Sequence, residues 1–283
     1  MSVTAADIGE RIALSFGPDW KTQSADGFVT GNPAIEVTGI ATTFAPSLAV
    51  LQQAVAKNIN LSISRENPFW ARNKPRGTGN DPVRRGPSLE SDQVFQLKRD
   101  YIAANRLVIY HLFENWNARP VDAQLVGLAK ALDWVEYYKP SGGPDWGFDN
   151  GFFDLPATTL RAAALQIKGR LGVRSLRVGG NSELPVRRVG LSHGMYWLDD
   201  LQKLLAEPGV DLLVMGEPQW ENELAQYSFD LADAGKSHGL ILLGQAVSED
   251  PGSGEMAAWL GGFIREVPIT WIPTGEPTWM PYS

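Results

Sequence analysis

Polar side chains follow four apolar runs of this sequence, each short enough to be a single strand. They are Arg65 with Glu66, His111, Glu217, and Gln245 with Glu249. Ligands of open α/β sheets bind at the carboxyl ends of parallel strands. If the four strand ends meet at one edge, their carboxylates, amides and imidazole could hold one or two divalent ions that activate water.

Two other interpretations of the glutamates need no metal. Glu66 and Glu249 could act as general acid and base if burial raised the pKa of one of them. Each carboxylate could also simply stabilise the N-terminus of a following helix. For any single glutamate the helix cap is the favoured interpretation, whereas four polar strand ends taken together favour a site.

Two segments of the chain, 37–70 and 189–220, look like copies of one another. Each has a glycine-bearing strand, a helix-patterned stretch, a second strand and then a glutamate. The separation from Gly39 to Glu66 is 27 positions, and that from Gly190 to Glu217 is also 27. Two βαβ units of this kind, facing each other, would place their glutamates in one shared cleft.

Strands alternate with helices along the whole sequence, which predicts an α/β (α+β layered) protein of two related lobes with a cleft between them. Lobe one would comprise about 1–135 plus the C-terminal strands, and lobe two about 136–283, packed as one unit. Helices are predicted at 4–14, 46–58, 91–104, 120–132, 158–171, 221–235 and 254–263. Strands are predicted at 36–42, 60–64, 106–111, 176–178, 211–215, 239–244 and 267–272, with an antiparallel pair within 134–155.

The stretch 67–90, directly after Glu66, is rich in proline, glycine and basic residues and has no periodicity. A structureless stretch of this length in a folded domain is usually functional. It could be a lid over the cleft or an arm that reaches a neighbouring subunit, and a solvated loop is the simplest alternative.

Composition excludes several classes of protein. A net charge of −7 and a pI near 5.1 argue against nucleic-acid binding, which needs a basic face. The absence of cysteine excludes disulfides, zinc–thiolate sites and cysteine nucleophiles. No apolar run is long enough to span a bilayer, so no membrane association is expected. Without a signal-peptide pattern the default location is cytoplasmic, and a leader removed before position 1 would change that expectation.

Three segments carry a resemblance to a known family. Arg-Glu-Asn-Pro-Phe-Trp at 65–70, Gly-Glu-Pro-Gln-Trp at 216–220 and Gly-Gln-Ala-Val-Ser-Glu at 244–249 resemble motifs of the NIF-three-like proteins, which are also called dinuclear-metal-centre hexameric proteins. The resemblance runs in order from about Thr4 to Pro273. It implies two related lobes with a metal cleft between them and a toroidal hexamer. Some members of the family are described as a second type of GTP cyclohydrolase I.

The metal ligands of that family are only partly present. Where the first motif has His-His or His-Glu, this chain has Arg65-Glu66, and where the last has Gly-His-x-x-x-Glu, Gln245 replaces the histidine and Glu249 is kept. The middle motif is a histidine followed four positions later by an aspartate, or a His-Asp-His-x-His cluster, and this chain can be aligned with it in two registers. One register keeps His111 as the histidine and places Asn115 at the position of the aspartate. The other places Phe113, Glu114, Asn115 and Asn117 at positions of the cluster.

These replacements change the metal chemistry that the cleft could support. Carboxylate and amide oxygens suit magnesium, calcium or manganese, whereas zinc prefers imidazole. Arg65 would repel a second cation, and its guanidinium could replace a metal by pairing with Glu66 and Glu249. The expected cofactor is therefore none, or one divalent ion held weakly by Glu66, Glu114 and Glu249.

The remaining candidate ligand-binding groups are aromatic or lie near the cleft. Trp70, Trp116 and Trp220 could stack on a ligand, although core packing is the favoured explanation for tryptophans. His193 is expected to make a local hydrogen bond, and His238 is expected to be solvated.

Three functions remain open at this point. The first is a small and perhaps anionic ligand bound in the cleft by Arg65, Glu66, Gln245 and Glu249 without strong metal catalysis. The second is a metal-dependent hydrolase, acting on a nucleotide-like or cyclic amide substrate through one ion. The third is a non-catalytic regulatory or assembly protein, in which a homo-oligomeric ring is itself the function. No phosphate-binding, serine-hydrolase or zinc-protease motif occurs in its proper context.

Overall fold

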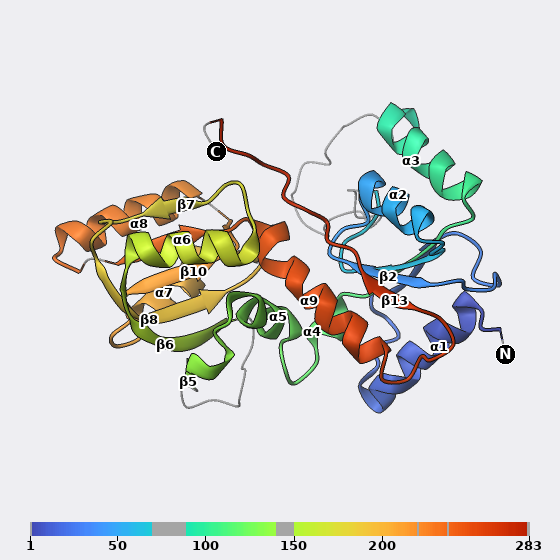
Figure 1. Cartoon of the computed structure of the whole chain (residues 1–283), viewed down its shortest axis with the longest axis horizontal. Coiled ribbons are helices and arrows are strands. Elements are labelled where there is room, and N and C mark those ends of the chain that lie inside the picture. Colours follow the sequence, from blue (N-terminus) through green and yellow to red (C-terminus); the bar gives the residue numbers. More distant parts are fainter. Residues whose placement is uncertain (1, 70–88, 140–149, 220, 237, 282–283) are drawn as a thin grey trace. The chain divides into compact units, whose positions relative to one another are not determined.

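The computed structural model describes residues 2–69, 89–139, 150–219, 221–236 and 238–281. Contacts divide the chain into two units (Figure 1). Unit 1 is Met1–Ala118 with Met256–Thr274, and unit 2 is Arg119–Glu255 with Gly275–Ser283. Trp70, Trp220 and most of the stretch predicted as a lid or arm lie outside the described residues.

Unit 1 is built on a five-stranded sheet with the strand order β1-β4-β3-β2-β13. The strands are β1 (Gly27–Thr30), β2 (Ile40–Thr43), β3 (Leu61–Ser64), β4 (Val108–His111) and β13 (Ile269–Trp271). All neighbours are parallel except β1, which runs antiparallel to β4. The parallel strands β2 and β3 are buried along their whole length, as expected for strands covered on both faces.

Helices of unit 1 pack on this sheet through short apolar clusters. They are α1 (Ala5–Phe16), α2 (Leu48–Ala56), α3 (Gln93–Ala104) and the single turn α4 (Glu114–Asn117), with 3₁₀ turns at Gly17–Asp19 and Leu89–Ser91. Thr4 caps α1, because its hydroxyl accepts from the Asp7 backbone nitrogen while the Asp7 carboxylate accepts from the Thr4 backbone nitrogen. Leu51 of α2 and Ile102 of α3 share a core with Ile109 of β4.

Unit 2 has a six-stranded mixed sheet with the order β5-β6-β8-β10-β12-β7. The strands are β5 (Tyr138–Lys139), β6 (Asn150–Thr159), β7 (Arg177–Gly179), β8 (Pro185–Ser192), β10 (Leu212–Met215) and β12 (Gly239–Leu242). Strands β8, β10 and β12 are parallel, and the three outer strands are antiparallel to their neighbours. The predicted antiparallel pair is confirmed as β5 with β6. A separate short pair joins β9 (Met195–Tyr196) to β11 (Glu217–Pro218).

The core of unit 2 lies on both faces of the sheet, and the side chains of β10 point alternately into one part and the other. Leu212 and Val214 pack with α5 (Ala123–Leu132) and α6 (Leu160–Leu171). Leu213 and Met215 pack with α7 (Leu198–Ala206) and α8 (Glu221–Asp233). Successive strand residues point to opposite faces, so one four-residue strand supplies both cores.

The two similar segments both form a strand, a helix and a parallel strand. The first contains β2, α2 and β3, and the second contains β8, α7 and β10. Their registers differ, since Ile40 pairs with Leu61 whereas Val189 pairs with Leu212, two residues further along the segment. A shift of two residues keeps every side chain on its face. The sequence suggested that the first stretch of lobe one runs to about 135, and in the structure the first stretch of unit 1 runs to Ala118 and the second over Met256–Thr274.

The prediction of a last helix over 254–263 was wrong at its start. Helix α9 runs from Gln245 to Leu260 and contains Pro251 in its interior. Proline removes one helical hydrogen bond and normally ends a helix. Here α9 packs against α5 at backbone distance, because a Cβ on Gly127 would lie 2.6 Å from the Gly252 nitrogen and the Pro251 carbonyl oxygen. This close packing favours the continuous helix. No helix of the described residues is both long and apolar enough to cross a membrane.

Candidate functional site

A buried histidine lies between two carboxylates at the strand ends of unit 2. His193 follows the last residue of β8, and its Nε2 lies 2.8 Å from Asp122 Oδ2. Its Nδ1 lies 3.2 Å from Glu249 Oε1. Asp122 is the N-cap of α5 and Glu249 lies in the second turn of α9, so two helices and a strand contribute to the cluster.

The charges of this cluster favour a protonated ring. Burial alone would lower the pKa of His193, but the charge and hydrogen bond of Asp122, followed by those of Glu249, outweigh it and raise the pKa to about 9. An imidazolium can donate from both nitrogens, which matches the two carboxylate contacts. At neutral pH His193 therefore supplies a fixed positive charge inside unit 2.

Two glycines allow the chain to close around the cluster. A Cβ on Gly194 would lie 2.8 Å from Glu249 Oε1, and one on Gly216 would lie 2.2 Å from the Gly194 carbonyl oxygen. Ser248 connects the same elements, since its hydroxyl accepts from the Gly194 nitrogen at 3.0 Å and donates to the Gln245 carbonyl at 2.8 Å.

Helix α9 brings Gln245 and Glu249 together, as their spacing of one helical turn allows. The amide nitrogen of Gln245 lies 3.4 Å from Glu249 Oε2. Gln245 is half-buried and Glu249 is almost fully buried. Glu217 is exposed in β11, opposite Met195, and it shows no contact with Glu249 among the contacts of the described residues. Glu66 belongs to unit 1, so its convergence with Glu249 stays a prediction.

In unit 1, Arg65 is buried at the end of β3. Its Nη1 donates to Asn117 Oδ1, and its guanidinium lies 4.6 Å from the centre of the Phe113 ring. Glu66 is half-buried, and its nitrogen donates to the Phe44 carbonyl at 2.8 Å. The predicted neighbours Arg65 and Asn117 therefore do meet, as a cation held between an amide and an aromatic ring.

The other predicted residues of unit 1 hold a loop in place. Asp26 accepts from the backbone nitrogens of Phe113, Glu114 and Asn115 at 2.7, 3.1 and 2.8 Å, and so caps α4. His111 Nδ1 contacts the Ala25 carbonyl at 3.2 Å and Asp26 at 3.4 Å.

The side chains of Glu114 and Asn115 complete this network. Glu114 Oε1 accepts from the Ala25 nitrogen at 3.2 Å, and Asn115 Oδ1 accepts from the Lys21 nitrogen at 2.7 Å. Burial would raise the pKa of Asp26, but the hydrogen bonds of His111 and of the α4 backbone outweigh it and lower the pKa. These contacts give His111, Glu114 and Asn115 a structural role.

Within each unit, several carboxylate oxygens of the predicted ligand Glu114, the predicted ligand Glu249 and the nearby Asp122 already accept hydrogen bonds. A ligand oxygen must be free to face the ion, whereas Glu249 Oε1 and Asp122 Oδ2 both face His193. Asp122 Oδ1 accepts from two α5 backbone nitrogens, and Glu114 Oε1 accepts from Ala25. Among the described residues, no group of three or more histidine or acidic side chains is arranged to hold a metal.

Sequence reasoning missed the importance of three residues. Asp122 and Asp26 were not among the candidate site residues. His193 was expected to bond locally, but its partners lie 71 and 56 positions away in sequence. Only the scarcity of histidine could have drawn attention to it. His238, expected to be solvated, is half-buried, and its Nδ1 has no hydrogen-bond partner among the described residues. Trp116 is a core residue, and the centres of its ring and the Trp259 ring lie 5.1 Å apart.

No family model matches this sequence, and no curated protein matches it. Solved structures do match it over nearly its full length. The Staphylococcus aureus hypothetical protein SA1388 superposes with a TM-score of 0.67 at 17% identity, covering 98% of this chain and 99% of that one. A Bacillus cereus protein related to NIF3 gives a TM-score of 0.68 at 12% identity, covering 99% of each chain. The chain has the NIF3-like fold.

A third structure of this kind is the protein ybgI, described as of unknown function, with a TM-score of 0.66 at 20% identity. It covers 98% of this chain and 100% of that one. At these identities the similarity establishes the fold and leaves the chemistry to the residues of each chain. In this chain the buried His193, whose pKa is raised, places a positive charge next to Glu249.

Proposed function

We propose that this protein binds a small molecule at the strand ends of a NIF3-like fold and works without a dinuclear metal centre. The observation that carries the proposal is the position of His193, with each ring nitrogen on a carboxylate. The positive imidazolium of His193 balances the negative charge of Asp122 and Glu249, which a metal ion would otherwise balance. The half-buried Gln245 amide, at the start of α9, is the group that we assign to ligand contact in unit 2.

Unit 1 supports the same conclusion independently. A metal site of the resembled type would need a ligand where Arg65 stands. The Arg65 guanidinium is buried, contacts Phe113 and donates to Asn117, so a positive charge is fixed at that strand end. A cation at this place disfavours a metal ion nearby.

A single-ion hydrolase is the second candidate, and the contacts disfavour it. Its ion would need Glu66, Glu114 and Glu249 together. The Glu114 oxygen Oε1 is held by the Ala25 nitrogen and Glu249 Oε1 by His193. Releasing both would break one exposed and one buried hydrogen bond, and it is the buried bond of Glu249 with His193 whose loss costs free energy.

Metal analysis separates the two candidates. Protein purified without chelators is expected to carry less than one equivalent of zinc, iron or manganese in total. The variant His193→Ala frees Asp122 and Glu249 and is expected to gain Mn²⁺ binding by calorimetry, whereas the control His238→Ala is not. Two equivalents of metal on the wild type would overturn the proposal. Binding itself is measured by thermal shift with nucleosides and cyclic amides, since a ligand of the native state raises the melting temperature.

We also propose that the chain self-associates. Met195 in β9 and Trp197, the residue before α7, are two positions apart and have 47% and 54% of their surface exposed. Large apolar side chains exposed together are typical of an interface. Light scattering coupled to gel filtration measures the mass, and Trp197→Ser is expected to weaken the assembly. A monomer at all concentrations would refute self-association.

A further inference from the structure

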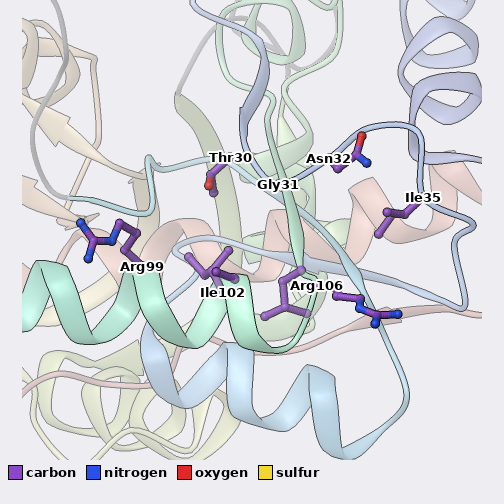
Figure 2. A pocket seen from close by; sticks show the side chains of 9 residues that line it. Thr30, Gly31, Asn32, Ile35, Arg99, Ile102 and Arg106 are labelled. Carbon is purple, nitrogen blue, oxygen red and sulfur yellow. The ribbon is translucent and has the colours of Figure 1, made fainter.

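A cavity in unit 1 is lined by none of the strand-end residues discussed above. Its volume is about 490 Å³, and it lies between the turn at Thr30–Asn32 and the second half of α3 (Figure 2). Buried Ile102 and Leu107 line it together with Ile35. A volume of this size is typical of small-molecule sites.

The polar groups around this apolar surface are mostly donors. Arg99 and Arg106 lie on opposite sides of Ile102 (Figure 2). Arg99 is paired with Asp100, at 2.8 Å, so its charge is largely balanced. Arg106 has no ion-pair or side-chain hydrogen-bond partner within the part of the chain that the structure describes. The oxygen of Asn32 accepts from the Ala34 nitrogen, which leaves the Asn32 amide hydrogens as donors.

Arg106 also has an unfavourable backbone conformation. Its φ is 51°, in the left-handed region. It follows the end of α3, where the backbone nitrogen of Leu107 donates to the Ile102 carbonyl and the backbone nitrogen of Arg106 donates to the Ala103 carbonyl. Glycine is the usual residue at this position of a helix end. The other non-glycine residues with positive φ in the described chain are Asn58 and Asp133, and these residue types tolerate it. An arginine kept here at the expense of stability indicates a function.

We propose that this cavity binds a small acid with an aliphatic body, whose carboxylate or phosphate head pairs with Arg106. The apolar side chains of Ile35, Ile102 and Leu107 would contact the body of the ligand. None of the described residues that line the cavity is aromatic, so none of them would stack on a planar ring such as a nucleobase. The head is bound by charge-assisted hydrogen bonds from the guanidinium, with Asn32 as a second donor.

Calorimetry on the full chain tests this site with four probes. Octanoate and octyl phosphate carry both parts of the ligand and distinguish a carboxylate from a phosphate head. Inorganic phosphate carries only a head, and 1-octanol has no charge. Binding of octanoate or octyl phosphate, at least about tenfold tighter than either partial probe, is expected from the sum of the two contacts.

The variant Arg106→Gly separates binding from folding, because glycine relieves the backbone strain. It is expected to weaken binding of the acid about tenfold or more while its urea midpoint stays at or above that of the wild type. Lys57→Gln, which removes an exposed positive charge of unit 1 outside the cavity, should leave binding unchanged. The proposal is overturned if neither acid binds, if inorganic phosphate binds as tightly as octyl phosphate, or if Arg106→Gly binds normally. A lower urea midpoint for Arg106→Gly would also overturn it, since Arg106 would then be explained by stability.

Discussion

The ionisation of His193 gives the sharpest test of the unit 2 cluster. Its pKa is raised from 6.5 to about 9, mainly by Asp122 against the opposing effect of burial. One pKa unit corresponds to about 1.4 kcal/mol, so the net shift, in which burial opposes the two carboxylates, stabilises the folded state by about 3 kcal/mol while the ring is protonated. Because the folded state binds the proton more tightly, this stabilisation is complete below pH 6.5 and is lost as the pH rises through about 9.

Nuclear magnetic resonance of ¹³C-histidine protein measures the pKa of each ring directly. The chain has three histidines, so His111→Gln and His238→Gln assign the His193 signal by elimination. That signal should titrate near pH 9 in the wild type.

Variants of the two carboxylates test the cause of the shift. Asp122→Asn should lower the pKa of His193 more than Glu249→Gln does, because the charge of Asp122 is the larger raising effect. Asparagine caps helices as well as aspartate, so α5 should keep its start. Asp92→Asn makes the same exchange at the cap of α3 and should leave His193 unchanged. A His193 pKa at or below 6.5, or no change in Asp122→Asn, would refute the reasoning.

Three further predictions concern backbone packing, a cap and a buried amine. Gly216→Ala places a Cβ 2.2 Å from a backbone oxygen and should lower the free energy of unfolding in urea by roughly 1–3 kcal/mol. The control is Gly169, which is exposed in α6, where an added Cβ would meet nothing within 4 Å. Gly169→Ala should leave the free energy of unfolding unchanged or raise it. Asp26→Ala should lower the free energy of unfolding by roughly 1–3 kcal/mol near pH 7. This loss should shrink at a pH below the usual pKa range of aspartate, because the wild-type carboxylate is then itself protonated. Equal stabilities of the two proteins at pH 7 would contradict the capping role. Burial lowers the pKa of the Lys98 amine to about 8. The unfolding free energy of the wild type relative to that of Lys98→Met should therefore rise between pH 8 and 10.5. If the difference between the two unfolding free energies does not change with pH, the amine is not buried.

Much of the fold followed from local sequence patterns. Apolar periodicity placed the helices and buried strands, and capping residues such as Thr4 and Asp122 marked helix starts that the structure has. Gly172 marked the end of α6 in the left-handed conformation, as predicted. The α9 start was missed because Pro251 is a local signal to stop, whereas the packing of Gly127 against α9 is a contact between residues distant in sequence.

The candidate site shows the same division between local and distant information. The sequence by itself showed Arg65 and Gln245 at the positions where the family resemblance implies imidazole ligands. It also determined that Gln245 and Glu249 share a helix face if a helix forms there. Only the tertiary structure decided that His193 reaches Asp122 and Glu249, and that Asp26 holds the start of α4. Such contacts depend on how strands and helices pack, and burial then sets their charge, so no spacing within the sequence encodes them.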